Sequence, residues 1–467
     1  TLKINNSNGV TLADSTTVNG ALTLTSGNVT TVSFAMIIGS SGIVSHTNGH
    51  VVGNLRKEFA SGMQSFTFDV GDATNYTPVA IASFNVTTPG NVTAKTTSTE
   101  HPNVGTSGIN SAKSVNRFWT LTAGGGIAFT TYDATFSFVS TDVDSSATAA
   151  NFVVRRFDGA NWFATTSGTK TATSTQATGI SSLSDFAIGE QIIDHYAVSA
   201  ASSQTAGIAF LTTVTAQDIL NETVTSDNNT VVTMSGSTGN VQFDSNSDGT
   251  FGDNTKTLTA GTFTISTKDN IAETINITAT DGNSKTGTRT GVVINPGTAT
   301  QLAFVQQPTD TVAGTVISPS VTVQLKDTQG NNVPTSGVSI TMSLSSGTGI
   351  LSGTTLKTTN ASGLATFNDL SINLAGSKNL TASSDGLTSA VSNSFTISAG
   401  TATKVVFVQQ PSDTTAGATI SPAVTVQLQD VSGNNVSTAG VSVAMSLSSG
   451  TGVLSGTTPK ATNASGL

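Results

Sequence analysis

The stretch FVQQPTDTVAG at residues 304–314 returns as FVQQPSDTTAG at residues 407–417. The similarity extends outward on both sides, so residues 298–364 align with residues 401–467 at a constant offset of 103. About 49 of the 67 aligned positions are identical. A period of roughly 100 residues exceeds the 20 to 50 residues of solenoid repeats and fits one β-sandwich domain per repeat. The sequence therefore predicts a duplicated domain.

Alternating apolar and polar residues within the repeat predict β-strands. The segments VTVQLK (321–326) and VSITMSL (338–344) alternate with period two, which places one face of a strand in a core and the other in water. Turn-forming sequences such as GNN, SGTG and NASG separate these segments. No sustained helical periodicity is present, so we expect an all-β fold.

The repeat also carries a recognisable motif, D-x-x-G-N-x-V, followed by G-x-L, T-N-x-S-G-L-A and A-G. Its residues are Asp327, Gly330, Asn331, Val333, Gly349, Leu351, Thr359, Asn360, Gly363, Ala365, Ala375 and Gly376. The pattern resembles bacterial Ig-like domains of the invasin and intimin type, over residues 298–400 and again over 401–467. The resemblance implies Ig-like sandwiches that act as a stalk or spacer in surface adhesins.

The chain divides into five predicted regions. Residues 1–57 contain short apolar steps that either stack as rungs of a parallel β-solenoid or form a meander, and residues 58–195 read as a β-sandwich. Residues 196–296 look like a diverged Ig-like domain, followed by the repeats 297–400 and 401–467. The second repeat ends before the counterparts of the last strands of the first, so we expect a continuation or a neighbour to supply them.

The N-terminal half carries a second resemblance. The segments VGDATNYTPV (70–79), NRFWTL (116–121) and SDFAIGE (184–190) are similar to segments of large secreted surface proteins of Bacteroidetes-type bacteria. Those proteins commonly leave the cell by the type IX route, which this resemblance implies here.

Composition excludes several classes of protein. Only 10% of residues are charged, the net charge is −9 and Lys plus Arg number 18. No segment is basic enough to neutralise a run of phosphates, which excludes nucleic acid as an expected partner. No apolar run approaches the ~20 residues that span a bilayer, so no direct membrane insertion is expected. The absence of cysteine excludes disulfides and thiolate metal sites.

The strongest candidate binding site is DSNSDGTFGDN at residues 244–254. Asp244, Asn246, Asp248 and Thr250 occupy positions one, three, five and seven of a calcium-loop pattern, with a glycine at position six. Position twelve is Thr255 rather than glutamate, and Asp253 is the candidate replacement. The sequence predicts a Ca²⁺ site here, and an Asx-rich hairpin turn is the alternative interpretation.

Ser15, Thr311 and Thr414 each follow an aspartate and precede a small or apolar residue. This context looks like the O-glycan acceptor of Bacteroidetes, so modification at these hydroxyls is a hypothesis.

Other candidates have simpler interpretations. The histidines of HTNGH (46–50) flank an Asn-Gly turn rather than a helix, and Asp142 and Asp144 read as strand-end or turn residues. SGTK at 167–170 lies in a Thr/Ser-rich turn. Tyr76, Trp119 and Trp162 are candidates for a sugar-stacking platform, but aromatics in alternating strands usually belong to the core.

The sequence thus predicts a non-catalytic protein of the bacterial cell surface. Tandem Ig-like domains would form a rod or a homopolymeric filament, with homomeric contacts and with surface glycans or a ligand on a host or neighbouring cell as further partners. Low charge supports self-assembly because few lysines are present to protect strand edges. The alternative is an accessory carbohydrate-binding region of a secreted multidomain enzyme.

Overall fold

The computed structural model describes residues 1–467 and confirms an all-β fold with solenoid-like stacking and sandwich-type sheets. Two compact units can be distinguished. One comprises Thr1–Ser202, Ala209–Thr267 and Ile275–Val292, and the other comprises Ser203–Ile208, Lys268–Thr274 and Val293–Leu467. No helix has the length and hydrophobicity that a membrane span requires.

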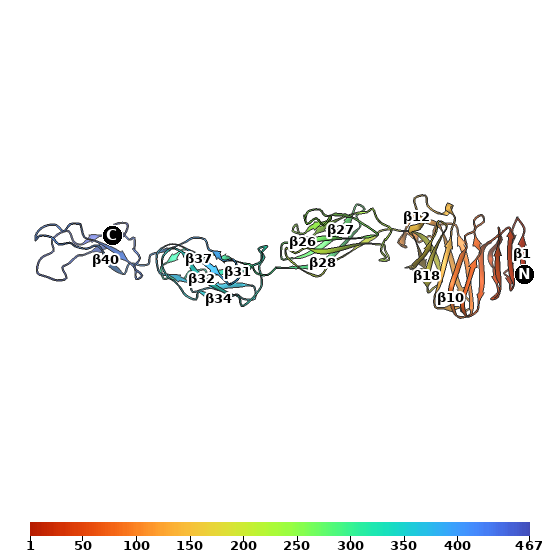
Figure 1. The fold of residues 1–467 in the computed structure, drawn as a ribbon, viewed down its shortest axis with the longest axis horizontal. Helices are drawn as coiled ribbons and strands as arrows, with labels where there is room; N and C mark the ends of the chain where they lie inside the picture. The colour runs from red at the N-terminus through yellow and green to blue at the C-terminus, as the bar shows by residue number, and fades with distance from the viewer. The chain divides into compact units, whose positions relative to one another are not determined.

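The first strands stack in parallel, so the solenoid and not the meander is the arrangement that forms (Figure 1). Val10, Val29, Val51 and Val70 pair in successive rungs, and this apolar column explains why the rungs keep one register. The strands are β1 (Leu2–Asn5), β2 (Val10–Thr11), β3 (Thr16–Val18), β4 (Ala21–Ser26), β5 (Val29–Ile38), β6 (Ile43–His46), β7 (Val51–Phe59), β8 (Gly62–Phe68) and β9 (Val70–Gly71).

Strand β7 joins the solenoid to the sandwich that follows. It runs parallel to β5 and antiparallel to β11, and one hydrophobic core extends from Ile4 to Ile188 across the predicted boundary at residue 57. The remaining elements are β10 (Val79–Thr88), β11 (Gly90–Thr97), η1 (Val104–Thr106), β12 (Ile109–Gly124), β13 (Ala128–Phe129), β14 (Tyr132–Ser137), η2 (Ser140–Asp142), η3 (Ala149–Asn151), β15 (Phe152–Phe157), β16 (Trp162–Ala164), β17 (Thr166–Lys170), β18 (Ser174–Ile180) and β19 (Asp185–Gln191).

Two further sheets follow, in the strand orders β20-β22-β26-β24 and β21-β28-β27-β23-β25. Their side chains alternate between buried and exposed, as in β22 and β27. The strands are β20 (His195–Ser199), β21 (Ser203–Thr205), β22 (Phe210–Gln217), β23 (Val231–Gly236), β24 (Gln242–Asp244), β25 (Thr255–Thr257), β26 (Thr262–Lys268), β27 (Thr274–Asp281) and β28 (Thr286–Asn295).

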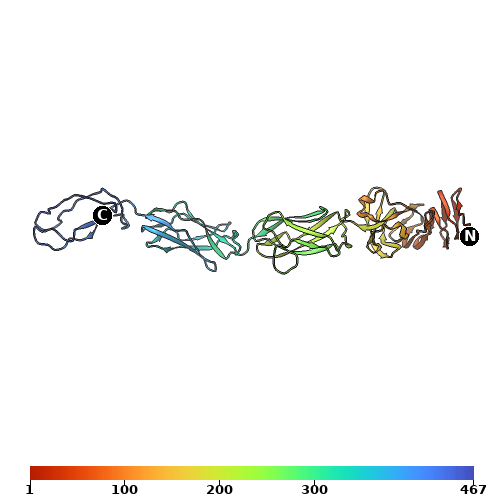
Figure 2. The ribbon, with the colours of Figure 1, turned by 90° about the horizontal axis from the view of Figure 1, so that it is seen from above.

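The first repeat folds around its own core, with sheets β29-β31-β35 and β30-β39-β37-β32-β34 (Figures 1 and 2, teal to light blue). The two predicted strands are confirmed as β31 and β32. The strands are β29 (Gln301–Gln306), β30 (Thr311–Val312), β31 (Val321–Lys326), β32 (Ser339–Ser346), β33 (Leu351–Ser352), β34 (Leu356–Thr358), β35 (Leu364–Phe367), β36 (Ser371–Ile372), β37 (Gly376–Ser383), β38 (Ala390–Val391) and β39 (Phe395–Ser398).

The second repeat forms fewer strands from nearly the same sequence. Leu302 is 6% exposed in the first repeat, whereas its counterpart Val405 is 49% exposed. Phe407, the counterpart of the half-buried Phe304, is 42% exposed. The strands are β40 (Lys404–Gln409), β41 (Thr425–Gln429), β42 (Ser442–Val443) and β43 (Lys460–Ala461).

Candidate functional sites

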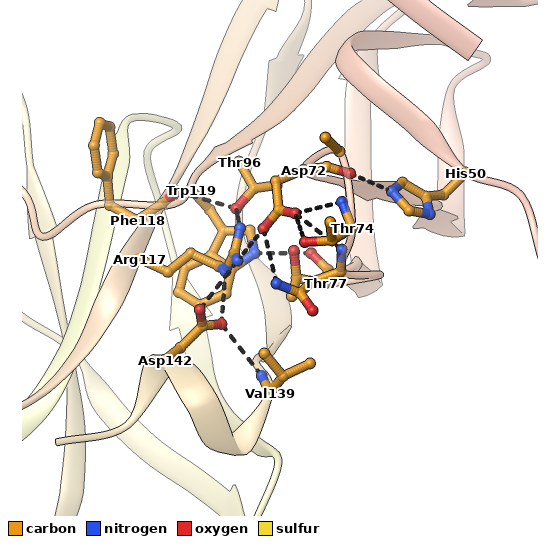
Figure 3. Close-up of polar contacts among 12 residues, drawn as sticks. His50, Asp72, Thr74, Thr77, Thr96, Arg117, Phe118, Trp119, Val139 and Asp142 are labelled. Atoms are coloured by element: carbon orange, nitrogen blue, oxygen red, sulfur yellow. Dashed lines mark hydrogen bonds and ion pairs between the residues drawn. The ribbon is translucent and has the colours of Figure 1, made fainter. Parts of the chain in front are cut away.

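A buried arginine connects three segments of the first unit. Arg117 lies on β12 and is fully buried. Its Nη2 donates a hydrogen bond to Asp72 Oδ2 at 2.5 Å and its Nε donates to Asp142 Oδ2 at 2.8 Å, while its Nη1 donates to Thr96 Oγ1 at 3.2 Å. Figure 3 shows the guanidinium between the two carboxylates. The loop after β9, helix η2 and strand β11 are thereby held against β12.

Hydrogen bonding favours the charged forms of Asp72 and Arg117. Desolvation opposes ionisation of Asp72, but donors from Thr74, Asn75 and Arg117 outweigh it and hold the pKa of that carboxyl well below its usual range. Burial likewise opposes the charge of Arg117, yet its bonds to Asp142 and Asp72 raise its pKa. The donors and acceptors are directed at one another, which suits them to holding the fold together rather than to acting on a substrate.

The two histidines of HTNGH lie beside this cluster and contact backbone carbonyls. His46 Nδ1 is 2.6 Å from Gly49 O, and His50 Nε2 is 2.6 Å from Asp72 O. The ring of His46 stacks on Tyr76, with centroids 3.8 Å apart. The two imidazoles therefore have partners other than a shared metal ion, and no group of three or more His, Cys, Asp or Glu side chains is placed to hold one.

Tyr76 donates a hydrogen bond of 2.5 Å to Asp69 Oδ1. Burial raises the pKa of Asp69, although the tyrosine hydroxyl acts in the opposite direction. Burial also lowers the pKa of His50, and the hydrogen bond to the Asp72 carbonyl offsets this only in part. The titratable side chains of His50, Asp69 and Tyr76 therefore lie where the solenoid meets the sandwich.

The sequence did not single out Arg117 or Asp72, although one signal was available. Arg117 occupies the same face of β12 as Val115, Trp119 and Leu121, all of which are buried. A charged residue on the apolar face of an alternating strand must find a partner, because an unpaired buried charge is very costly. Which partner it finds depends on tertiary structure.

The remaining histidines also have partners that the sequence did not show. His101 is buried among Phe118, Phe157 and Trp162, and its Nε2 is 3.4 Å from Asp185 Oδ2. His195 Nδ1 is 3.1 Å from the adjacent Asp194. Local packing and a neighbouring carboxylate therefore account for both arrangements.

Four predicted calcium ligands lie within one hydrogen-bonded loop. Asp244 is buried and accepts backbone hydrogen bonds from Ser247 and Gly249. Asn246 Nδ2 donates to Asp248 Oδ2 at 3.1 Å, and Asp248 Oδ1 accepts from Thr250 N at 2.7 Å.

The fifth predicted ligand, Asp253, is anchored beside the start of this loop. It forms a backbone bridge with Asp244, and its Oδ2 accepts hydrogen bonds from the amide and the hydroxyl of Ser245. The carboxylates of Asp244, Asp248 and Asp253 each accept hydrogen bonds within this turn and do not form a group placed to hold a metal ion, so the Ca²⁺ site stays a prediction.

Both tryptophan side chains belong to hydrophobic cores. Trp119 is fully buried and donates to Thr77 O, and Trp162 is 6% exposed and donates to Asn103 O. Neither indole presents a face to solvent, so these residues do not form a sugar-stacking platform with Tyr76.

The predicted O-glycan positions and turn residues are placed as follows. Ser15 and Thr414 are exposed and Thr311 is half-buried on β30, so the modification stays a prediction. Asp144 Oδ2 accepts from Ser114 N at 2.8 Å. Ser167 is exposed on β17.

Comparison with known proteins gives one family match and several structural likenesses. A family described as SMCHD1 Ig-like domain 6 matches residues 297–383. No curated protein matches the chain. The structurally similar proteins include bacterial adhesins of the invasin and intimin type.

Three of these structures show the extent of the likeness. InvD of Yersinia pseudotuberculosis is 16% identical with a TM-score of 0.28, over 58% of this chain and 82% of that one. The adhesin InvE of the same organism is 16% identical with a TM-score of 0.22, over 47% and 69%. Invasin is 16% identical with a TM-score of 0.24, over 54% and 52%. Likenesses at this level carry no argument about function.

Proposed function

We propose that this chain is a non-catalytic, extracellular structural or adhesive protein of the bacterial cell surface, in which tandem Ig-like domains act as a spacer. The observation that carries this proposal is the near-identical repetition of residues 298–364 as 401–467. Copying a sandwich adds length, since a ten-residue strand spans ~33 Å, but it does not by itself create a new binding site.

Conserved bonding between the two copies supports a structural purpose for the repeat. Gln324 Nε2 donates to Ser362 O at 2.9 Å, and Gln427 Nε2 donates to Ser465 O at the same distance. The repeats therefore share buried polar contacts as well as surface sequence. The charged side chains around Arg117 are already bonded to one another, which favours a structural role for them too.

We further propose that the protein assembles into a rod or a homopolymeric filament. A surface with only 10% charged residues weakens self-repulsion and leaves few lysines to protect strand edges. Contacts between copies through these edges, or through the solenoid at residues 1–57, would produce a polymer. A free tip could then engage glycans or a protein on another cell.

Electron microscopy of the native protein recovered from its source tests the proposal. A regular axial or lattice repeat supports a polymer, and separate elongated particles support a spacer that does not polymerise. Sedimentation that shows monomer alone at high concentration would count against self-assembly. Resistance of the protein to protease added to intact cells would contradict a surface location.

A further inference from the structure

The motif asparagine of each repeat bonds to a loop about sixty residues earlier. Asn331 Nδ2 donates to Asn270 O at 2.9 Å, and Asn331 Oδ1 accepts from Ala272 N at 3.0 Å. All three residues belong to the second compact unit. One side-chain amide therefore satisfies a carbonyl and an amide two residues apart, as a neighbouring strand would.

The second repeat reproduces this contact. Asn434 Nδ2 donates to Asn373 O at 2.9 Å, and Asn434 Oδ1 accepts from Ala375 N at 2.7 Å. The accepting loops are Asn270-Ile271-Ala272 and Asn373-Leu374-Ala375, so both have the form N-[IL]-A. The contact is present although several apolar side chains of the second repeat are exposed, so it does not depend on their burial.

A buried aspartate orients each asparagine. Asp327 Oδ1 accepts from Asn331 N at 2.8 Å and its Oδ2 accepts from Asn331 Nδ2 at 2.9 Å. Asp327 Oδ2 also accepts from Gly297 N at 2.9 Å, which ties the preceding linker to the same loop. Asp327 and Asn331 are 2% and 9% exposed. The Asn331 side chain is thus already fixed in the orientation that binds the loop at residues 270–272, which limits the conformational entropy lost when the two loops meet.

The second repeat holds its asparagine in the same way. Asp430 accepts from Asn434 N and Asn434 Nδ2, both at 2.8 Å, and from Gly400 N at 2.9 Å. The linker glycine, the aspartate and the asparagine are therefore hydrogen-bonded to one another in the same way in both repeats.

The diverged domain contains the same aspartate but not the asparagine. Asp218 corresponds to Asp327, and four residues later stands Glu222 instead of asparagine. Asp218 Oδ2 instead accepts from Arg155 Nη2 at 2.5 Å and from Gln191 Nε2 at 3.0 Å. An ion pair with a specific side chain here replaces recognition of backbone atoms.

We propose that the D-x-x-G-N loop is a coupling surface whose partner is the N-[IL]-A loop of the preceding sandwich. The asparagine side chain bonds to a backbone carbonyl and a backbone amide of that loop. Any sandwich that presents the loop can therefore precede any repeat that carries the motif. The aspartate and asparagine are positioning residues that restrict movement between successive domains, which small interfaces otherwise permit. The coupling does not depend on where the protein acts, so it stands apart from the proposed function.

The test uses spin labels at Thr205→Cys, on β21 of the preceding sandwich, and at Thr366→Cys, both within the second compact unit, in a chain that has no native cysteine. Both sites are exposed. Pulsed electron resonance measures the distribution of distances between them. Asn331→Ala should broaden the distribution roughly twofold, because a short linker alone allows domain motion. The matched control is Asn332→Ala, an exposed neighbour in the same loop.

A second variant acts on the receptor and leaves Asn331 unchanged. Ala272→Pro removes the amide that Asn331 Oδ1 accepts from and should also broaden the distribution. Circular dichroism verifies that the sheets of each variant remain folded. Distributions as narrow as that of the unsubstituted labelled chain in both folded variants would overturn the proposal, as would equal broadening by Asn332→Ala.

Discussion

At the scale of single residues, Arg117 is a fully buried charge of the first unit that is paired with two carboxylates. Replacing it with methionine leaves Asp72 and Asp142 without their cationic partner in a largely buried setting. Breaking a buried ion pair in this way costs about 3 to 5 kcal/mol. We predict that Arg117→Met lowers the free energy of unfolding by that amount. Denaturant titration followed by tryptophan fluorescence measures it, because the two tryptophans, Trp119 and Trp162, both belong to the first unit.

The control for this prediction is an exposed ion pair in the same unit. Lys285 Nζ lies 3.6 Å from Asp194 Oδ1, and both side chains are about 40% exposed. Surface pairs of this kind contribute about 0 to 1 kcal/mol. Lys285→Met should therefore leave the fluorescence transition nearly unchanged, and an equal effect of the two substitutions would refute the assigned role of Arg117.

His50 gives the first unit a pH dependence of defined sign. Its pKa lies below the ordinary 6.5 in the folded protein, chiefly through burial and despite its bond to Asp72 O. The unfolded chain then binds a proton more readily, so stability is complete above about pH 6.5 and declines as pH falls toward the folded pKa. The facing groups are His46, Asp69, Asp72 and Arg117.

We predict that His50→Gln flattens this decline, since glutamine does not titrate and still offers a donor for the Asp72 carbonyl. Unfolding by denaturant at a series of pH values below 6.5, with tryptophan fluorescence as readout, measures the slope. The same slope in the variant and in the unsubstituted chain would rule out His50 as its origin.

How much of a residue's role the sequence reveals depends on how local that role is. Val321 and Val323 are buried as alternation predicted. The bonds of Asn331 to its own aspartate are also local, and the motif marked both residues. The partners of Arg117 come from positions 72, 96 and 142, and its contacts could not be predicted from a period-two pattern. The partner loop at residues 270–272 could not be predicted either, because only the structure identifies its N-I-A sequence as the partner of Asn331.

At the scale of elements, the loop at 244–254 offers a test of the calcium prediction. Its ligands alternate carboxylate and amide oxygens around Gly249, but Thr255 stands where glutamate would bind in bidentate fashion. A site without that ligand should be weak, with a dissociation constant of about 10⁻⁴ to 10⁻³ M, as in extracellular modules.

We predict that titration calorimetry with Ca²⁺ gives heat in the millimolar range and that Asp248→Ala abolishes it. Asp385→Ala, which removes an exposed carboxylate elsewhere, should have no effect. The absence of heat in the unsubstituted chain would leave the Asx-rich turn as the correct interpretation. Heat that persists in Asp248→Ala would point to binding outside the loop.

The solenoid shows why element pairing is harder to predict than element existence. Short apolar steps in residues 1–57 are compatible with parallel rungs or with an antiparallel meander, because both bury one face of each strand. The tight turns decide between them: Gly27 has a φ of 78°, and a Cβ there would lie 1.7 Å from Asn6 O of the adjacent rung. Only glycine permits this close approach, and only the structure identifies which rung approaches.

At the scale of the whole molecule, the two repeats provide an internal comparison of one sequence in two settings. Leu325 and Val333 are buried in the first repeat, and their counterparts Leu428 and Val436 are buried in the second. These positions surround the coupling loop. Phe407, in contrast, is exposed, because the first repeat covers its equivalent face with strands from residues 365–398. Burial in this domain therefore depends on strands distant in sequence.

This dependence yields a prediction about the second repeat. Appending a copy of residues 365–400 after Leu467 should complete its core, since that segment supplies Phe367, Leu380 and Ile397 to the first repeat. Each large apolar side chain removed from water contributes about 1.5 to 3 kcal/mol.

Binding of a hydrophobic dye to the extended chain should fall, and amide protons of residues 401–467 should exchange more slowly. The matched control carries Phe367→Asp and Leu380→Asp in the appended copy, which preserves length but not the apolar face. Equal dye binding by the extended chain and this control would show that the appended strands do not cover the apolar side chains of the second repeat, and would contradict the prediction.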